Sequence, residues 1–225
     1  LNEPYSLDNI CIDESYFDLC VHVAASHELD CIKDPLRAMN TNVLGTSALL
    51  DLCVTKKIKR FVYISTFHVF GLNRGILNED VKAKPLNYYG LSHSLAEEAV
   101  FMLNRITDMN CSVVRLPNIL GLPLDLGNFD RWSLAPFDFC LQAAKSNSIV
   151  LKTAGDQKRN WLEINAMAKL AVKVANLERN LECVHLVGTD MSVVDFAKAI
   201  SAGWNKQFSK SVSVDILKMP SFTAP

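Results

Sequence analysis

Short apolar runs alternate with amphipathic stretches in the first half of the chain, and this alternation constrains the fold more than any other feature. The runs lie at residues 19–25, 60–65 and 111–116, and the stretches between them, about 34–56 and 89–106, have helical spacing. Strands that alternate with helices are typical of βαβ units, in which the strands are parallel. The sequence therefore predicts an α/β fold built on a parallel sheet.

The alternation becomes less regular after the third apolar run, which indicates two regions. We expect residues 1–121 to form the parallel core, and residues 122–225 to contribute further sheet elements together with a small lobe. With 225 residues the chain can bury a sizeable core. It opens with Leu1 rather than Met, and three interpretations stay open: a fragment, a processed piece or a truncated gene product.

Charge and cysteine usage narrow the class of protein. The net charge is −1, whereas nucleic-acid-binding proteins usually carry a basic face, so we expect no nucleic-acid partner. The seven cysteines include no CxxC pair and are expected to be reduced, mostly buried thiols without a metal site. No stretch is apolar enough to span a membrane and no signal peptide is visible, so we expect a cytoplasmic protein without a membrane partner.

Small and hydroxyl-bearing residues follow the predicted strands, at the ends where open α/β sheets bind ligands. Ala24 and Ala25 end the first run, where they either admit a flat ligand or allow close helix packing. Thr66 ends the second run, and its hydroxyl either binds a substrate oxygen or only terminates the strand. Asn42, three positions before Gly45, either bridges backbone groups, holds a water near a site or is a surface residue.

A tyrosine and a histidine share one face of the next predicted helix. Tyr89 and His93 are four residues apart, and Tyr89 follows Thr66 by 23 positions. A tyrosine near a cation has a lowered pKa and acts as a general acid or base. Asn118, after the third strand, is either a substrate contact or part of a Pro-Asn turn.

The order of these signals resembles the extended short-chain dehydrogenase/reductases, the NAD-dependent epimerase/dehydratase group. The resemblance covers residues 17–200 and is greatest to the dTDP-4-dehydrorhamnose reductases within that group. The residues that carry it are Ser65-Thr66 with Val69-Phe70, Pro85-Leu86-Asn87-Tyr88-Tyr89-Gly90, His185-Leu186-Val187-Gly188 before Met191-Ser192, and Phe222-Thr223-Ala224-Pro225. It implies a doubly wound, Rossmann-type parallel sheet, N-terminally incomplete, with a small C-terminal substrate lobe.

The resemblance also implies roles for individual residues. Catalysis falls on Thr66, Tyr89 and His93, and no residue is assigned to a metal. The cofactor-binding candidates, for NAD or NADP, are Ala24, Ala25, Asn42, Tyr89, His93, Leu116 and Pro117. The substrate-binding candidates are Phe67, His68, Asn118 and Arg159.

Two departures from the family pattern affect the cofactor side. The Gly-rich turn that places a pyrophosphate on a helix N-terminus is absent, because none of the nine glycines precedes Leu19, so residues 1–121 are expected to be a partial NAD(P)-binding core. His93 stands where the family has lysine. An imidazole is shorter than a lysine and mostly neutral at about pH 7 unless its pKa is raised, so it would assist Tyr89 less.

Three functions are compatible with these features. The leading one is an NAD(P)-dependent oxidoreductase or epimerase that acts on a nucleotide-linked sugar, with Tyr89 passing the proton and a homodimer as a candidate assembly. The alternative is a non-catalytic binding or regulatory protein of the same fold, which His93 and the missing Gly-rich segment favour. A decayed or truncated gene product is the third.

Overall fold

The computed structural model describes residues 17–71, 75–177 and 181–217, which form two compact units. The first unit comprises Leu1–Pro117 and Asn165–Val187, and the second comprises Asn118–Ile164 and Gly188–Pro225. The segment Asn165–Val187 belongs to the first unit, so the part of the chain after residue 121 contributes to both units. The closing segment 222–225, which contributed to the resemblance, lies outside the described residues.

A parallel sheet is the centre of the first unit. Its strands are β1 (Leu19–His22), β2 (Arg60–Thr66), β3 (Asn110–Leu116) and β7 (Cys183–His185), in the order β1-β2-β3-β7. The first three coincide with the three predicted apolar runs, although β1 ends at His22 rather than Ala25. The predicted α/β fold with a parallel sheet is confirmed.

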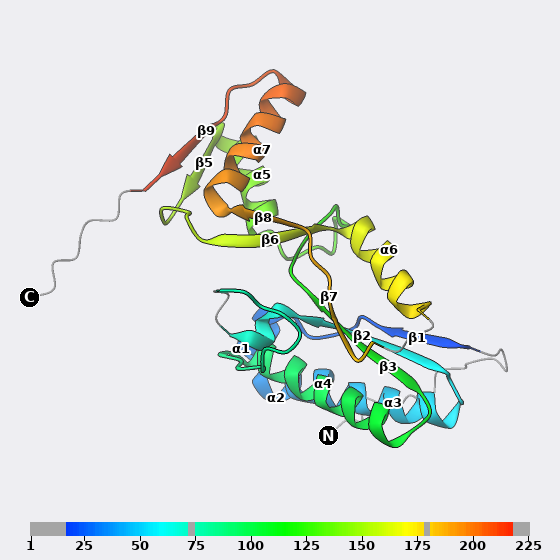
Figure 1. Cartoon of the computed structure of the whole chain (residues 1–225). Helices are drawn as coiled ribbons and strands as arrows, with labels where there is room; N and C mark the ends of the chain where they lie inside the picture. Colours follow the sequence, from blue (N-terminus) through cyan, green and yellow to red (C-terminus); the bar gives the residue numbers. More distant parts are fainter. Residues whose placement is uncertain (1–16, 72–74, 178–180, 218–225) are drawn as a thin grey trace, which may run out of the picture. The chain divides into compact units, whose positions relative to one another are not determined.

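Helices cover both faces of this sheet (Figure 1). One face carries α3 (Gly45–Thr55) and α4 (Tyr88–Ile106), and α6 (Ile164–Ala175) lies on the other. Shorter elements fill the connections, and they are α1 (Glu28–Lys33), α2 (Pro35–Met39), the π-helical turn η2 (Asn40–Leu44) and the 3-10 helix η3 (Phe67–Phe70). The predicted helix at 34–56 is therefore α2, η2 and α3 in succession, and α1 was not predicted.

The core of the first unit lies between the sheet and helices α3 and α4. Fully enclosed apolar side chains from each layer meet there, among them Leu50, Phe61, Val100 and Val113. A buried aliphatic or aromatic side chain contributes roughly 1.5 to 3 kcal/mol through removal from water. This packing fixes α4, and with it the residues at the start of α4, against the ends of β2 and β3.

Two small sheets and two helices form the second unit. The strands are β4 (Asn118–Leu120), β6 (Lys158–Glu163) and β8 (Thr189–Ser192) in one sheet, and β5 (Ser148–Leu151) and β9 (Ser213–Ile216) in the other. Helices α5 (Ala135–Ser146) and α7 (Val193–Phe208) pack beside them. The rings of Trp161 and Phe196 stack at 4.2 Å in the core of this unit.

Several boundaries in the second half differ from the sequence-based expectation. Residues 118–120 form β4 where a loop was expected, because they pair with β6, a strand too polar to be recognised. Ser192 caps α7, since its hydroxyl accepts a hydrogen bond from Asp195 N at 3.1 Å. That helix continues through Gly203 to Phe208, because Gly203 has open space around it and does not interrupt the turns.

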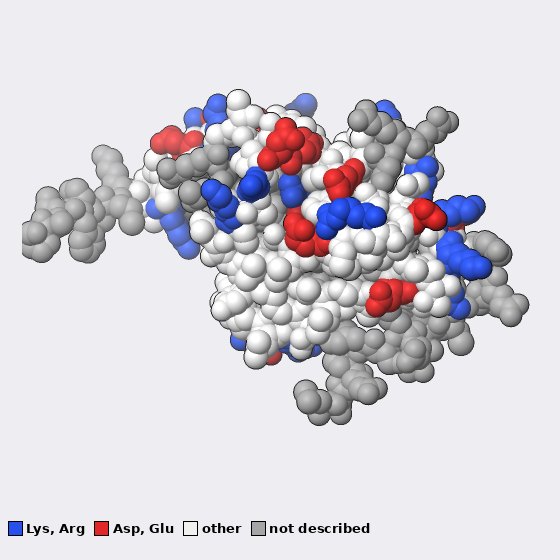
Figure 2. Space-filling view, turned by 60° about the horizontal axis from the view of Figure 1, so that its bottom comes forward, with Lys and Arg blue, Asp and Glu red and all other residues white. Residues whose placement is uncertain are grey.

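The surface and the cysteines are unexceptional within the described part of the chain. Figure 2 shows basic and acidic side chains interspersed over one face. Cys31, Cys53 and Cys111 are buried free thiols and Cys140 is exposed, while Cys11 lies outside the described residues. Within the described ranges, no group of three or more potential metal ligands gathers, and no helix has the length and apolar character needed to cross a membrane.

Candidate functional site

The predicted site residues of the first unit gather where its parallel strands end. Thr66 and Leu116 are register partners at the ends of β2 and β3. His22, the last residue of β1, pairs with Tyr63, so the segment carrying Ala24 and Ala25 continues from the same edge. The carboxyl ends of parallel strands are where ligands bind in open α/β sheets.

Thr66 is held in a fixed orientation at the end of β2. Its side chain is buried, and its Oγ1 accepts a hydrogen bond from His68 N at 3.2 Å, which caps η3. Phe67, the first residue of η3, packs against Phe70 and His185, with ring centroids 6.1 and 5.0 Å away. The strand end therefore positions the Thr66 hydroxyl, whereas Phe67 is occupied by packing.

The start of α4 approaches η3 closely, and this brings Tyr89 to His68. Asn87 caps the helix through a 2.8 Å hydrogen bond from Gly90 N to its Oδ1. A Cβ on Gly90 would clash with the carbonyl group of His68, so this approach requires glycine. The rings of His68 and Tyr89 meet edge-to-face with centroids 5.3 Å apart.

His93 lies one turn further along α4 and is enclosed between two tyrosines. Its ring meets that of Tyr89 edge-to-face at 4.6 Å, and its Nδ1 lies 2.8 Å from the Tyr63 hydroxyl. Only 3% of His93 and 1% of Tyr63 is exposed, whereas Tyr89 is half-buried. The predicted pair Tyr89 and His93 is thus in direct contact, and Tyr63 is an unpredicted third member.

Burial keeps this cluster uncharged. The pKa of His93 is lowered to about 4, mainly by removal from water, with smaller contributions from the neighbouring His68 and His22. Burial also raises the pKa of Tyr63 well above its ordinary value, assisted by Glu97 and Tyr89. His93 is therefore a neutral imidazole at about pH 7, and it does not supply the positive charge that a lysine would.

One atom of His93 is left without a partner. Among the described residues, its Nε2 is buried and makes no hydrogen bond. A buried polar atom without a partner is rare in native structures and calls for an explanation such as a ligand. The orphaned nitrogen is compatible with a hydroxyl-bearing cofactor, and the cofactor-binding role of His93 stays a prediction.

Asn42 connects the segment after β1 to α4. It is 1% exposed and lies in the π-helical turn η2, a feature that often marks functional sites. Its Oδ1 accepts from Ser26 N at 2.6 Å, and its Nδ2 lies 3.3 Å from Ser26 O and 2.9 Å from Ser92 Oγ. The prediction that Asn42 bridges backbone groups is confirmed, whereas its role toward a cofactor stays a prediction.

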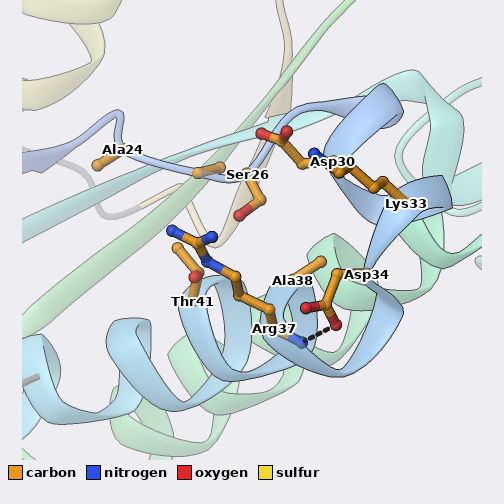
Figure 3. A pocket seen from close by; sticks show the side chains of 9 residues that line it. Ala24, Ser26, Asp30, Lys33, Asp34, Arg37, Ala38 and Thr41 are labelled. Carbon is orange, nitrogen blue, oxygen red and sulfur yellow. Dashed lines mark hydrogen bonds between the residues drawn. The ribbon is translucent and has the colours of Figure 1, made fainter. Parts of the chain in front are cut away.

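A cavity of about 400 Å³ opens beside the segment after β1. Ala24, Ala25 and Ala38 give it small walls, and two cations, Lys33 and Arg37, also line it. Figure 3 shows the Arg37 guanidinium pointing from α2 toward the segment of Ala24 and Ser26. The remaining lining residues are Ser26, Asp30, Asp34 and Thr41. The two carboxylates balance the two cations, so the lining has no net charge and its small walls are what leaves room for a ligand.

Two predicted substrate contacts belong to the second unit. Asn118 begins β4, and its Nδ2 donates to Asn160 O at 3.1 Å. Arg159 lies in β6 and donates to Lys158 O at 3.4 Å. Their roles toward a substrate stay predictions, as do those of Leu116 and Pro117 at the end of β3.

A second buried polar cluster, absent from the sequence-based prediction, lies beside the first. Glu97, one turn after His93, receives two hydrogen bonds from the Arg115 guanidinium, at 3.0 and 2.7 Å, and one from the Ser65 hydroxyl. Arg115 also stacks on the Phe70 ring at 4.9 Å. Tyr63 and Ser65 are two positions apart on the buried face of β2, which is the one signal that could have paired them with α4.

The sequence of the chain matches a family model over residues 2–186, and that model is the NAD dependent epimerase/dehydratase family. The chain belongs to this family. The membership agrees with the order of Thr66, Tyr89 and the parallel strands that carry them. The narrower resemblance to dTDP-4-dehydrorhamnose reductases is not confirmed.

Individual members of the epimerase/dehydratase family are similar at low identity. A dTDP-D-glucose 4,6-dehydratase of Dictyostelium discoideum is 27% identical over 209 residues, which cover 86% of this chain and 46% of that protein. The UDP-N-acetylglucosamine 4-epimerase from Methanobrevibacter ruminantium M1 superposes with a TM-score of 0.78 at 20% identity, covering 91% of this chain and 64% of that one. The UDP-glucuronic acid 4-epimerase from Bacillus cereus, in complex with UDP-glucuronic acid and NAD, gives a TM-score of 0.74 at 22% identity, with 89% and 62% covered.

Two of the curated relatives that the chain matches are covered only in part. The chain spans about half the length of these proteins, 46% in one case and 49% in another. The structural similarities lie below 25% identity and show the fold alone.

Proposed function

We propose that the chain carries the proton-transfer side of an NAD(P)-dependent enzyme that acts on a nucleotide-linked sugar. The observation that supports this most strongly is the contact of Tyr89 with His93 and His68, next to the buried Thr66 at the carboxyl end of a parallel sheet. Relatives point the same way, since the matched proteins are a dehydratase of a dTDP-sugar and epimerases of UDP-sugars.

Each residue has a distinct task in the proposed reaction. The Thr66 hydroxyl binds the oxygen of the reacting sugar carbon and orients it toward Tyr89. Tyr89 takes the proton from that sugar hydroxyl during oxidation and returns it during reduction. A bound nicotinamide would supply hydride transfer at the same carbon. Asn42, which binds the backbone of Ser26, and His93 would hold this cofactor.

The cofactor is proposed as NAD or NADP. The Bacillus cereus epimerase was solved with NAD, and the RMD protein of Pseudomonas aeruginosa, at a TM-score of 0.77, with NADPH. Ala24 and Ala25 leave room beside the strand end, and the cavity with Lys33 and Arg37 adjoins them. Calorimetric titration of the chain with NAD⁺ and NADP⁺ tests this point, and binding of neither would refute the enzyme interpretation.

Substitution of Tyr89 tests the catalytic assignment. We expect Tyr89→Phe to lower turnover of UDP- or dTDP-hexoses by on the order of 100- to 10,000-fold, because the phenolic proton is lost. Its neighbour Tyr88, which is 52% exposed, provides a matched control, and Tyr88→Phe should retain full activity. Equal activity of the two variants would remove Tyr89 from the mechanism.

The alternative is a non-catalytic binding protein of the same fold, and the neutral His93 favours it. His93→Lys separates the two functions. An enzyme weakened by the neutral imidazole should gain activity at about pH 7 to 8, because a cation beside Tyr89 lowers its pKa. A binding protein should show no turnover with either residue.

A homodimer is the proposed assembly, and one face of α4 supports it. Leu95, Met102 and Ile106 lie along a single stripe of that helix and are 44%, 45% and 67% exposed. An apolar stripe on a helix is typical of an interface. Light scattering on the wild type and on Met102→Glu tests this, and a monomer in both cases would contradict it.

A further inference from the structure

The two nitrogens of the His93 ring have unequal surroundings. Nδ1 lies 2.8 Å from the Tyr63 hydroxyl, whereas Nε2 is enclosed and has no hydrogen-bond partner among the described residues. A neutral imidazole carries one proton, and the partner of one nitrogen decides which nitrogen holds it. The direction of the Tyr63 hydrogen bond therefore determines what Nε2 offers.

Chemistry favours Tyr63 as the donor in this bond. A phenol is a good donor and a weak acceptor, and a neutral imidazole nitrogen is a good acceptor. Burial keeps the Tyr63 hydroxyl protonated, so its proton is available to Nδ1. The proton of the imidazole then resides on Nε2.

The neighbouring His22 provides an internal comparison. Its Nε2 lies 2.9 Å from Thr46 Oγ1, and that hydroxyl donates its own proton to Asn42 O at 2.6 Å. Thr46 must therefore accept from His22, which fixes the proton of His22 on Nε2 as well. The difference is that the N–H of His22 is bound, whereas the N–H of His93 is not.

We propose that Tyr63 is a positioning residue that holds His93 as the Nε2–H tautomer, so that one neutral N–H donor lies beside Tyr89 for a ribose oxygen of the bound dinucleotide. This inference rests on the proposed function. It assigns to Tyr63 and His93 together a task for which the family uses a single lysine. The donor is directional and uncharged, so it orients a hydroxyl without charging the site.

The groups around His93 do not stabilise a positively charged imidazolium. The side chains that face it are His22 from β1, Tyr63 from β2, His68 from η3 and Tyr89 from its own helix. The carboxylate of Glu97, one turn further along α4, is bound to Arg115 and Ser65. Among the described residues, no carboxylate contributes to the pKa shift of His93.

Access to Nε2 requires a small movement. The nitrogen is enclosed, so an oxygen reaches it only when a neighbouring side chain turns aside. Tyr89 packs against the ring at 4.6 Å and is itself half-buried, so it is one of the side chains that border the imidazole.

Nuclear magnetic resonance of the chain labelled with ¹⁵N-histidine tests the tautomer directly. The chain has five histidines, and His93→Gln identifies the resonances of His93. We expect a protonated Nε2 and an unprotonated Nδ1 in the wild type, a mixture of both tautomers in Tyr63→Phe, and no change in Tyr88→Phe. A protonated Nδ1 in the wild type, or the same tautomer in Tyr63→Phe, would overturn the proposal.

Titration with NAD⁺ tests the donor role. We expect the Nε2 resonance of His93 to shift on binding in the wild type, and Tyr63→Phe to bind NAD⁺ several-fold more weakly. Binding of NAD⁺ that leaves the His93 resonances in place would overturn the donor role. Absence of any NAD⁺ binding would refute the proposed function and the donor role, while the tautomer result would still stand. Should Tyr63→Phe fail to fold, the wild-type spectra decide both points.

Discussion

Two buried polar clusters attach α4 to β2, and they differ in charge and in completeness. In the Glu97 cluster, the carboxylate is paired with Arg115 through two hydrogen bonds and accepts a third from the Ser65 hydroxyl. In the His93 cluster, Tyr63 and His93 share one neutral hydrogen bond, and Nε2 of His93 has no partner among the described residues. The two clusters are similarly buried, but all polar atoms of the Glu97 carboxylate are hydrogen-bonded, whereas the His93 ring keeps one unbonded nitrogen.

The comparison indicates which cluster supports the fold and which supports the ligand. A buried charge requires full pairing, and a saturated network holds its elements rigidly. An unpaired neutral atom reduces stability modestly and is retained where a ligand completes it. We therefore expect large stability effects in the Glu97 cluster and functional effects in the His93 cluster.

The largest expected effect comes from breaking the buried ion pair. Glu97→Ala should lower the free energy of unfolding by about 3 to 5 kcal/mol, because it leaves the Arg115 charge buried without a partner. Urea denaturation measures this, and Glu98→Ala, at an exposed position of the same helix, is the control, with an expected change within about 0.5 kcal/mol. Equal losses in both variants would mean that the ion pair has no special weight.

The next effect concerns acid. The pKa of His93 is about 4 in the folded chain against an ordinary value of 6.5, so between these values the unfolded chain binds the additional proton. Stability should fall as the pH is lowered from 6.5 to 4, by about 3 kcal/mol from this residue alone, and be constant above that window. Between these pH values, His93→Gln should lose about 3 kcal/mol less free energy of unfolding than the wild type. Denaturation of both proteins at several pH values measures this difference. His22 and His185 also have pKa values lowered by burial, and their contribution persists in the variant.

Removal of the Tyr63 hydroxyl has a smaller expected effect. Tyr63→Phe should lower the free energy of unfolding by roughly 1 to 3 kcal/mol, because Nδ1 of His93 is then buried without a partner. The double variant Tyr63→Phe, His93→Phe removes both polar partners and should recover part of the loss. Denaturation of the single and double variants measures the coupling, and strictly additive losses would show that the hydrogen bond contributes nothing.

The smallest effect is expected within the charged cluster itself. Ser65→Ala should lower the free energy of unfolding by about 1 kcal/mol, since Glu97 retains both bonds from Arg115. Urea denaturation beside Glu97→Ala makes the contrast. If Ser65→Ala lost as much free energy of unfolding as Glu97→Ala, the stability of the cluster would depend on the serine rather than on the ion pair.

Much of the first unit could be predicted because its signals are local. The apolar runs gave β1, β2 and β3, and helical spacing gave α4 within one residue of its start. Thr66 and Tyr89 were found because each follows a strand end or opens a helix. The pairing of Tyr63 with His93 was missed, because residues 30 positions apart meet only through the docking of α4 on β2.

The second half was predicted less well for two physical reasons. Strands β6 and β8 are short and polar, and their stability comes from pairing with each other and with β4 rather than from apolar alternation. Helix α6 is different, since Ile164, Met167, Leu170 and Val174 recur at helical spacing and were a readable signal. Strands β6 and β8 were therefore missed because they depend on tertiary pairing, and α6 was missed because its helical periodicity was overlooked.

The π-helical turn η2 has a consequence for the phase of the helix that contains it. Ala38, Asn42, Thr46 and Leu50 are all buried and are spaced by four residues each. At 100° per residue, a regular α-helix would rotate the last of these about 120° away from the first, whereas one residue absorbed by a π turn reduces the offset to about 20°. The wall of the cavity at Ala38, the clamp at Asn42 and the core contact at Leu50 therefore stay on one line. A single surplus residue thus lets one helix contact both the loop at Ser26 and the hydrophobic core with the same face.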